Sequence, residues 1–343
     1  MTAGDPCADL PEAPRVVALG GGHGLAASLS ALRRITPHIT AVVTVADDGG
    51  SSGRLRQELG VLPPGDLRMA LAALCGDDEW GRTWQEVVQH RFVSDGDLHG
   101  HVVGNLLIVA LWEKFGGNPV VGLDWVGRLL GARGRVLPMA SVPLDIAATV
   151  IGADPSSPGE TTTVRGQVAV ATTAGRLAAL RLLPENPPAC PDAVEAVRAA
   201  DWVVLGPGSW FSSVLPHLLV PELATALMHT PARKLVALNL APQPGETAGF
   251  SPEEHLEVLA AHAPELSLDA VLADPATVAD PASLQQEAAL FGAELHLHDV
   301  AADDGTPRHD PIRLAQAYAR VFAARPLAGR AAGDGPYGRR SRP

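Results

Sequence analysis

A glycine-rich loop near the start of the chain has the composition of a phosphate-binding site. Residues 20–24 read Gly-Gly-Gly-His-Gly, directly after an apolar run at 16–19 and before a helical pattern that begins near Leu25. Glycines let the backbone turn tightly and approach a ligand, and a helix N-terminus offers free N–H groups to an anion. The pattern predicts a phosphate or pyrophosphate site, with a tight structural turn as the alternative. The last glycine of a GxGxxG dinucleotide motif would fall on Leu25.

Two adjacent carboxylates, Asp47 and Asp48, follow the next predicted strand at 39–45. We expect one of them to bind a ribose hydroxyl, a metal ion or a reacting hydroxyl, because a loop this polar and rich in glycine does more than connect two elements. The alternative is that one of the carboxylates caps the turn that follows. The rest of this predicted loop comprises Gly49, Gly50, Ser51, Ser52, Gly53, Arg54 and Arg56.

Two further polar segments each precede an apolar helical pattern. In the first, Pro-Pro-Gly at 63–65 delivers Asp66 to a position where we expect it to cap the helix. In the second, His99 and His101 stand two residues apart, which is poor spacing for zinc ligands on one helix. Asn105, next to a glycine, is the better candidate there, with a side-chain amide that reads a base or a sugar.

A second junction of strand, glycines and helix lies at residues 205–213, which read Leu-Gly-Pro-Gly-Ser-Trp-Phe-Ser-Ser. Open parallel sheets bind ligands at the carboxyl ends of their strands, so this junction and the loop at 20–24 are expected to face each other and hold a diphosphate from both sides. The loop at 241–247 follows the next strand at the same edge. Its polar residues, among them Gln243, would reach a sugar.

The pattern of elements predicts an α/β fold, a Rossmann-like three-layer sandwich with a mainly parallel sheet. Short buried runs at 16–19, 39–45, 202–205, 235–240 and 270–273 alternate with helical patterns. Residues from about 145 to 183 are instead rich in threonine and turn signals, which indicates a β-rich insertion. We expect one domain over 15–324 between disordered tails at 1–14 and 325–343, the second of which carries Arg330, Arg339, Arg340 and Arg342.

Charge and composition exclude several classes of protein. The 343-residue chain has a net charge of −12, which disfavours a general nucleic-acid binder. Neither of its lysines, Lys114 and Lys234, lies in a Walker motif, so a P-loop NTPase is excluded. We find no apolar run of about 18 residues and no signal peptide, so we expect a cytoplasmic protein. The cysteines, Cys7, Cys75 and Cys190, are too widely separated to predict disulfides or a zinc cluster.

Several segments carry a family resemblance that covers the chain from about Val16 to Ala323. Their order and context resemble those of the YvcK-type proteins called gluconeogenesis factors. These belong to a larger CofD-like group that includes 2-phospho-L-lactate transferase, an enzyme of deazaflavin coenzyme synthesis. The matching segments are VVALGGGHGL, ITAVVTVADDGGSSGRLR, LGVLPPGDLRMAL, RGRVLP, VVLGPGSWFSSVLPHLLVPEL, PQPGET and RHDP.

The resemblance implies a cytoplasmic bacterial protein that binds UDP-N-acetylglucosamine and supports cell shape and cell-wall precursor supply during gluconeogenic growth. It implies no required cofactor, no nucleic-acid or membrane partner, a homo-oligomer, and a regulated protein partner such as the amidotransferase that makes glucosamine 6-phosphate. With the residues selected above, it gives the expected ligand contacts, which are Gly21, Gly22, His23, Gly24, Asp47, Gly49, Gly50, Ser51, Ser52, Arg56, Asn105, Gly206, Gly208, Ser209, Gln243 and Arg308.

Three departures from the family pattern bear on the ligand. His23 stands where the glycine loop usually has threonine, Met69 where an asparagine is usual, and Val102 with Val103 where the usual residues are serine and phenylalanine or leucine. Loss of polar partners at Met69 and Val102 would cost of order 1–3 kcal/mol of binding each. A different nucleotide, weaker binding or a diverged role is therefore also open.

Three functions remain open on the sequence. The first is a regulator that binds a nucleotide sugar, catalyses nothing and acts through a partner. The second is a transferase of the 2-phospho-L-lactate type, in which a hydroxyl acceptor displaces a nucleotide and Mg²⁺ is held on Asp47 or Asp48. The third is an NAD-dependent dehydrogenase, suggested by the first glycine loop alone. The segments VADDGGSSGRLR and PPGD favour the regulator.

Overall fold

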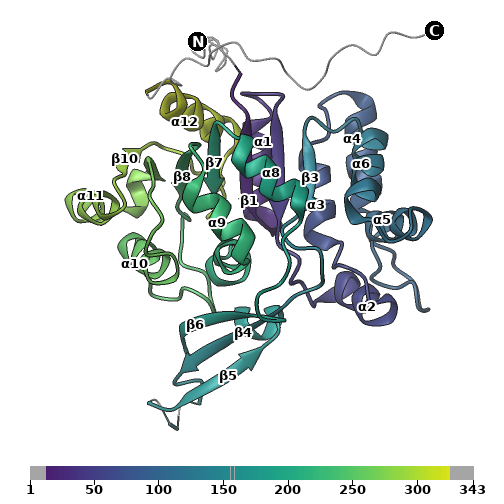
Figure 1. Ribbon diagram of the computed structural model, residues 1–343, viewed down its shortest axis with the longest axis horizontal. Coiled ribbons are helices and arrows are strands. Elements are labelled where there is room, and N and C mark those ends of the chain that lie inside the picture. The colour runs from purple at the N-terminus through teal and green to yellow at the C-terminus, as the bar shows by residue number, and fades with distance from the viewer. Residues whose placement is uncertain (1–12, 155, 158, 325–343) are drawn as a thin grey trace.

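The computed structural model describes residues 13–154, 156–157 and 159–324. Within them, seven strands form one sheet in the order β10-β9-β8-β7-β1-β2-β3, with helices flanking it (Figure 1). Every neighbouring pair in this sheet is parallel, so the predicted α/β fold is confirmed. The strands are β1 (Val16–Gly20), β2 (Ile39–Val43), β3 (Arg135–Pro138), β7 (Trp202–Leu205), β8 (Arg233–Ala237), β9 (Ala270–Ala273) and β10 (Glu294–Leu297).

The order of the strands reverses direction at β1. From β1 the chain moves outward to β2 and β3, and later β7 adds to the other side of β1, followed outward by β8, β9 and β10. β1, β7 and β9 are buried along their whole length, which explains their continuous apolar sequences. Such a reversal leaves a crevice at the carboxyl ends of the two central strands, where open α/β sheets bind ligands.

Many of the helices begin where the sequence supplies a side-chain cap or a proline, whereas α1 and α2 begin at glycines without a side-chain cap. Asn118 caps α6, Asp280 caps α11, and Ser251 forms a capping box with Glu254 at the start of α10. The helices are α1 (Gly22–Leu32), α2 (Gly50–Leu59), α3 (Gly65–Ala73), α4 (Glu79–Gln89), α5 (Val103–Lys114), α6 (Pro119–Leu130), α7 (Gln167–Ala171), α8 (Pro191–Ala199), α9 (Pro221–His229), α10 (Pro252–His262), α11 (Pro281–Leu290) and α12 (Pro311–Ala324). Short helices of other types are η1 (Trp210–Val214, π), η2 (Leu215–Leu219, 3₁₀) and η3 (Pro275–Thr277, 3₁₀).

A separate antiparallel sheet of three strands occupies the segment expected to be a β-rich insertion. Its strands are β4 (Asp145–Ile151), β5 (Thr161–Arg165) and β6 (Arg176–Leu183), with β4 in the centre. Figure 1 shows this sheet below the main sheet, beside the carboxyl ends of its strands. The short helix α7 connects β5 to β6.

Three contacts hold the insertion against the main body. The backbone N–H of Val168 in α7 donates to Asp48 Oδ1 at 3.0 Å. Asp145 accepts hydrogen bonds from Arg56 of α2 and from Arg165, each at 2.5 Å. At Gly245 the backbone packs so closely on α7 that a Cβ would lie 1.9 Å from the carbonyl oxygen of Ala171. The insertion is therefore fastened to the loops that surround the crevice.

Several boundaries differ from the sequence prediction. β2 ends at Val43 and α1 begins at Gly22 rather than near Leu25. The predicted loop after Asp48 continues as α2 from Gly50, because Ser51 and Ser52 are buried in contacts that favour a helix over the loop that their composition indicates. The edge strands β3 and β10 were not predicted, since both have only four residues and β10 is also partly exposed.

The predicted tails lie outside the described residues, apart from Ala13 and Pro14, and Cys7 lies outside them too. The Pro14 carbonyl accepts a hydrogen bond from the hydroxyl of Thr36 at 2.6 Å. Cys75 and Cys190 are buried free thiols. Over the described ranges no single helix has the length and apolar composition to cross a membrane. By those two criteria alone one bent pair does, namely Trp210–Leu219 with Pro221–His229 at 82°.

A buried hydrogen bond joins the first and last helices of the described chain, and it predicts a measurable coupling. The hydroxyls of Ser28 in α1 and Tyr318 in α12 are 2.9 Å apart. Tyr318→Phe leaves the Ser28 hydroxyl buried without a partner, so we expect the free energy of unfolding in urea to fall by about 1–2 kcal/mol. The double variant Ser28→Ala/Tyr318→Phe should lose less than the sum of the single losses. Strict additivity would show that the two hydroxyls do not interact.

Candidate functional site

The two predicted glycine loops meet at the reversal point of the sheet. One follows β1 and the other follows β7, and their backbones are in direct contact. A Cβ on Gly24 would lie 2.3 Å from the carbonyl oxygen of Pro207 and 2.5 Å from Gly208 Cα. No ligand group fits between the loops at this point. A ligand bound by both loops would lie across their outer residues, Gly22 and His23 on one side and Ser209 on the other.

The N-terminus of α1 has backbone N–H groups available to an anion. Gly21 occupies the N-cap position and provides no side-chain cap, and Gly22 has φ +56°. His23 is exposed in the first turn. The Gly22 N–H is already used, because it donates to the carboxylate of Asp66. The others remain free of side-chain caps, as a phosphate-binding turn requires.

Asp66 is not the helix cap that the sequence indicated. It lies inside the first turn of α3, after Pro64 in the N-cap position, and its carboxylate points to the glycine loop. A Cβ on Gly21 would lie 2.4 Å from Asp66 Oδ2, an oxygen that is buried without a hydrogen-bond partner. The Pro-Pro-Gly turn suggested a cap, and only the apolar residues around Asp66 signalled that it would be buried.

Asp47, which is half-buried, and Asp66, which is buried, are neighbouring carboxylates beside the first glycine loop. Burial, and then the charge of Asp47, raises the pKa of the Asp66 carboxyl to about 7. Burial also raises the pKa of Asp47, although Asp47 Oδ1 accepts the N–H of Gly49 at 2.9 Å. A diphosphate next to this pair is repelled less when Asp66 keeps its proton or when a cation lies between them.

Asp48 contacts the insertion rather than the first glycine loop. Its carboxylate accepts the Val168 N–H of the insertion, and a Cβ on Gly166 would lie 2.3 Å from Asp48 Oδ2. The charge of Asp47, by contrast, acts on Asp66. In the part of the chain that the structure describes, no group of three or more His, Cys, Asp or Glu side chains is placed to hold a metal ion.

Other predicted contacts in α2 and α5 are engaged with the protein itself. Ser51 Oγ accepts the side-chain N–H of Asn105 at 3.1 Å and lies 3.2 Å from His101 Nδ1. Asn105 Oδ1 in turn accepts the Nε–H of Arg68 at 2.9 Å, and Ser52 Oγ accepts the Gly65 N–H at 2.8 Å. This buried network holds the start of α2 against α3 and α5.

Arg56 is one of the expected ligand contacts, whereas Met69 and Val102 are departures from the family pattern. Arg56 pairs with Asp145 of the insertion. Val102 is buried, with its N–H donating to Ser51 Oγ, so this departure from the family pattern lies in the interior. Met69 is half-buried on α3.

The loop after β7 is fixed by two residues that the sequence did not single out. Asn239 forms two hydrogen bonds with Gly208, accepting its N–H at 2.9 Å and donating to its carbonyl at 2.8 Å. Glu246 is buried and accepts the N–H groups of Phe211 and Ser212 at 2.9 and 3.2 Å. Both residues follow β8, and only their places in the segments LVALNL and PQPGET would have suggested them.

Gln243 and Arg308, the last two expected ligand contacts, lie in different surroundings from each other. Gln243 Oε1 is buried without a hydrogen-bond partner, which leaves an acceptor free at the crevice edge of the sheet. Arg308 is exposed, and its guanidinium bonds Thr306 and Asp304 of its own loop rather than another predicted site residue. Its neighbour His309 is held by the backbone at Leu238, after β8, and burial lowers its pKa to about 4.

The chain matches a known protein family over most of its length. Residues 16–315 match the family model described as 2-phospho-L-lactate transferase CofD. The chain belongs to the CofD family. Within it, the chain is 56% identical to a putative gluconeogenesis factor of Mycobacterium tuberculosis, over 88% of both chains. It is 36% identical to the gluconeogenesis factor of Listeria innocua, over 89% of this chain and 94% of that protein.

A solved structure has the same CofD-family architecture. A crystal structure of a UPF0052-family protein from Bacillus halodurans superposes with a TM-score of 0.79 at 31% identity. The match covers 89% of this chain and 98% of that one. The overall fold is thus shared with a relative of moderate identity.

The contact between the two glycine loops predicts that position 24 tolerates no side chain. In Gly24→Ala the new Cβ would meet backbone atoms of Pro207 and Gly208, which cannot rotate away. We expect the free energy of unfolding to fall by about 1–3 kcal/mol, despite the helix propensity of alanine. Gly96→Ala, where a Cβ meets open space, is the control for thermal or chemical denaturation. Equal stability of both variants would contradict the contact.

The raised pKa of Asp66 predicts the sign of a pH effect. Its protonated form is favoured by folding, so the stabilisation is complete below the unfolded pKa near 4 and is lost as the pH rises through about 7. Asp66→Asn keeps an acceptor for the Gly22 N–H and removes the charge. We expect its stability relative to the natural chain to rise by about 2–4 kcal/mol between pH 4 and pH 8. A difference independent of pH in urea denaturation would exclude the shift.

Proposed function

We propose that the protein is a regulator that binds a nucleotide sugar, UDP-N-acetylglucosamine or a close relative, and acts without turnover. The observation that carries the proposal is the meeting of two glycine loops at the reversal point of the sheet. The first loop presents backbone N–H groups at the carboxyl edge and the second adds the Ser209 hydroxyl, so that a diphosphate would be bound there without lysine. Of the two lysines, Lys234 is buried in β8 and Lys114 ends α5.

The polar groups around the loops suit the rest of such a ligand. The unpartnered Gln243 Oε1 is an acceptor for a sugar hydroxyl or an amide N–H. Ser209, at the start of η1, supplies a hydroxyl beside the diphosphate position. A protonated Asp66 would donate to a phosphate oxygen instead of repelling it. These groups support a diphosphate joined to a sugar over a simple phosphate.

The biological role rests on the relatives. Proteins called gluconeogenesis factors match nearly the whole domain, which supports a role in gluconeogenic growth. We propose that this role lies in cell shape and cell-wall precursor supply. We propose that the chain works in the cytoplasm as a homo-oligomer. Its output would be a regulated partner, such as the amidotransferase that makes glucosamine 6-phosphate.

A Mg²⁺-dependent transferase is the second candidate, and the Asp47 and Asp66 pair favours it. Two neighbouring carboxylates, one with an unpartnered oxygen, fit a magnesium ion that takes its other ligands from phosphates and water. In such a reaction the acceptor hydroxyl oxygen forms a bond to phosphorus as the bond from phosphorus to the nucleotide breaks. The hydroxyl proton would pass to a carboxylate, and Asp47 is the candidate.

Calorimetric titration separates the two functions. The purified chain is titrated with UDP-N-acetylglucosamine, UDP, GDP and NAD, with and without Mg²⁺, and the mixtures are checked for products. We expect metal-independent binding of the UDP sugar with no turnover. Turnover that needs Mg²⁺ and is lost in Asp47→Ala, with binding retained, would establish the transferase instead. If none of the ligands bound, the proposed site would be wrong.

Paired glycine variants locate the binding. Gly22→Asp places a carboxylate at the diphosphate position, and Gly60→Asp places one on a glycine of similar backbone conformation, φ +67°, at the end of α2. We expect Gly22→Asp and Ser209→Asp to weaken UDP sugar binding at least tenfold and Gly60→Asp to leave it unchanged. Equal effects of Gly22→Asp and Gly60→Asp would show that backbone strain, and not the ligand, causes the loss.

A further inference from the structure

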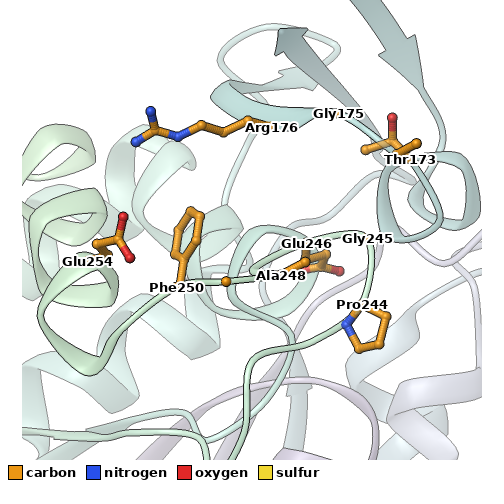
Figure 2. Close-up of a pocket in the computed structure, with 11 residues that line it drawn as sticks. Thr173, Gly175, Arg176, Pro244, Gly245, Glu246, Ala248, Phe250 and Glu254 are labelled. Carbon is orange, nitrogen blue, oxygen red and sulfur yellow. The ribbon is translucent and has the colours of Figure 1, made fainter. Parts of the chain in front are cut away.

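A pocket of about 530 Å³ opens between the insertion and the loop before α10 (Figure 2). One wall is the turn 173–176 that leads into β6. The other wall consists of residues 244–246 and 248–250 together with Glu254 of α10. None of these residues is among the ligand contacts proposed above, although residues 244–246 belong to the same loop as Gln243.

The helix α7 runs from the crevice at its start to the pocket at its end. At its start, the Val168 N–H binds Asp48 beside the crevice. At its end, the carbonyl of Ala171 packs against Gly245. Only after that contact does the chain reach Thr173, the first residue of the pocket wall. The contact of Ala171 with Gly245 therefore lies at the edge of the pocket, because Gly245 is one of its lining residues.

The polar groups of the pocket call for a ligand with an anionic group and hydroxyls. The guanidinium of Arg176 forms no hydrogen bond or ion pair with the described residues, and Figure 2 shows it extending above Phe250 on the side of Glu254. A free guanidinium matches a phosphate through two parallel hydrogen bonds. One oxygen of Glu254 accepts the Ser251 N–H at 2.8 Å, which leaves the other for a hydroxyl donor. The Thr173 hydroxyl stands on the opposite side (Figure 2).

Two residues of the pocket contact the segment that follows the second glycine loop. Glu246 bonds the backbone N–H groups of Phe211 and Ser212, and its second oxygen accepts the Ser212 hydroxyl at 2.5 Å. The ring of Phe250 packs edge-on against Phe211, with 6.3 Å between centroids. An occupant that presses on Glu246 and Phe250 therefore acts on residues just after Ser209. Glu246 and Phe250 therefore connect the pocket directly to the segment that follows the second glycine loop.

We propose that this pocket is an effector site for a small sugar phosphate. The phosphate binds Arg176, the sugar hydroxyls bind Glu254 and Thr173, and the apolar face of the sugar lies on Phe250. Occupancy orders the loop after β7 through Glu246 and strengthens binding in the crevice. The second half of this proposal rests on the proposed nucleotide-sugar function, whereas the pocket itself does not.

Direct titration of the full chain without nucleotide tests the pocket. Glucose 6-phosphate is the probe, with glucose and inorganic phosphate as separate arms. We expect saturable binding of glucose 6-phosphate that is at least tenfold tighter than that of either arm. Arg176→Gln should weaken it at least tenfold. Arg181→Gln should not, because Arg181 is an exposed arginine of the same strand that lies outside the pocket.

Three results would overturn the pocket proposal. Absence of saturable binding removes the site. Equal binding of inorganic phosphate means that an anion alone is recognised and the sugar is not. Equal losses in Arg176→Gln and Arg181→Gln mean that binding depends on general charge and not on this pocket.

A second titration tests the connection to the crevice. UDP-N-acetylglucosamine is titrated with and without saturating glucose 6-phosphate, and we expect its affinity to rise at least threefold when the pocket is occupied. Ala248→Trp fills the pocket from an exposed position and should abolish the binding of glucose 6-phosphate. Unchanged UDP sugar affinity would refute the effector role. If the UDP sugar failed to bind while Arg176-dependent probe binding persisted, the proposed function would fall and the pocket would stand.

Discussion

The close approach of two backbones at the centre of the sheet is the constraint on which the rest of the molecule depends. Because β1 and β7 are neighbours, the turns that follow them leave the sheet side by side, and Gly24 touches Pro207 and Gly208 with no side chain between them. This contact sets where α1 begins and where its N–H groups point. The flanking elements, α3 with Asp66 and the loop after β8 with Asn239 and Glu246, then pack around the pair of turns.

Two buried carboxylates at this edge show different solutions to the cost of burying charge. Glu246 accepts three hydrogen bonds from Phe211 and Ser212, so a charged form is compensated although burial raises its pKa. Asp66 has an oxygen without a partner and a like charge nearby, so it holds its proton more tightly. Glu246 therefore holds the loop after β7 in place, whereas Asp66 keeps one oxygen that no described residue binds.

The sequence predicts the core of the fold well because buried parallel strands leave a strong local signal. The runs at 16–19, 202–205 and 270–273 are continuous and apolar, and each is a fully buried strand. The glycine loops also lie where the sequence predicts them, since glycines directly after a buried strand strongly favour a tight turn. The edge strands β3 and β10 gave no such signal, because each has only four residues, β3 running from an arginine to a proline and β10 being partly exposed.

The roles of polar residues were harder to predict, because they depend on which distant segment arrives beside them. Asp48 looks like half of an acidic pair, yet its carboxylate is taken by Val168, far along the chain. Asp66 follows a turn that resembles a cap, and only the approach of the first glycine loop reveals its burial. Contacts across the insertion, such as Arg56 with Asp145, have no trace in local spacing.

The order of the strands also governs how the chain can fold while it is being synthesised. β1 finds β2 almost at once, but its other edge pairs with β7, whose first partner is Trp202 opposite Val16. Until that segment has left the ribosome, one side of an entirely apolar strand has no neighbour in the sheet. Unpaired strand edges of this kind are prone to association with other chains. The nascent protein therefore carries its most vulnerable edge at its centre, and completion of the sheet removes it.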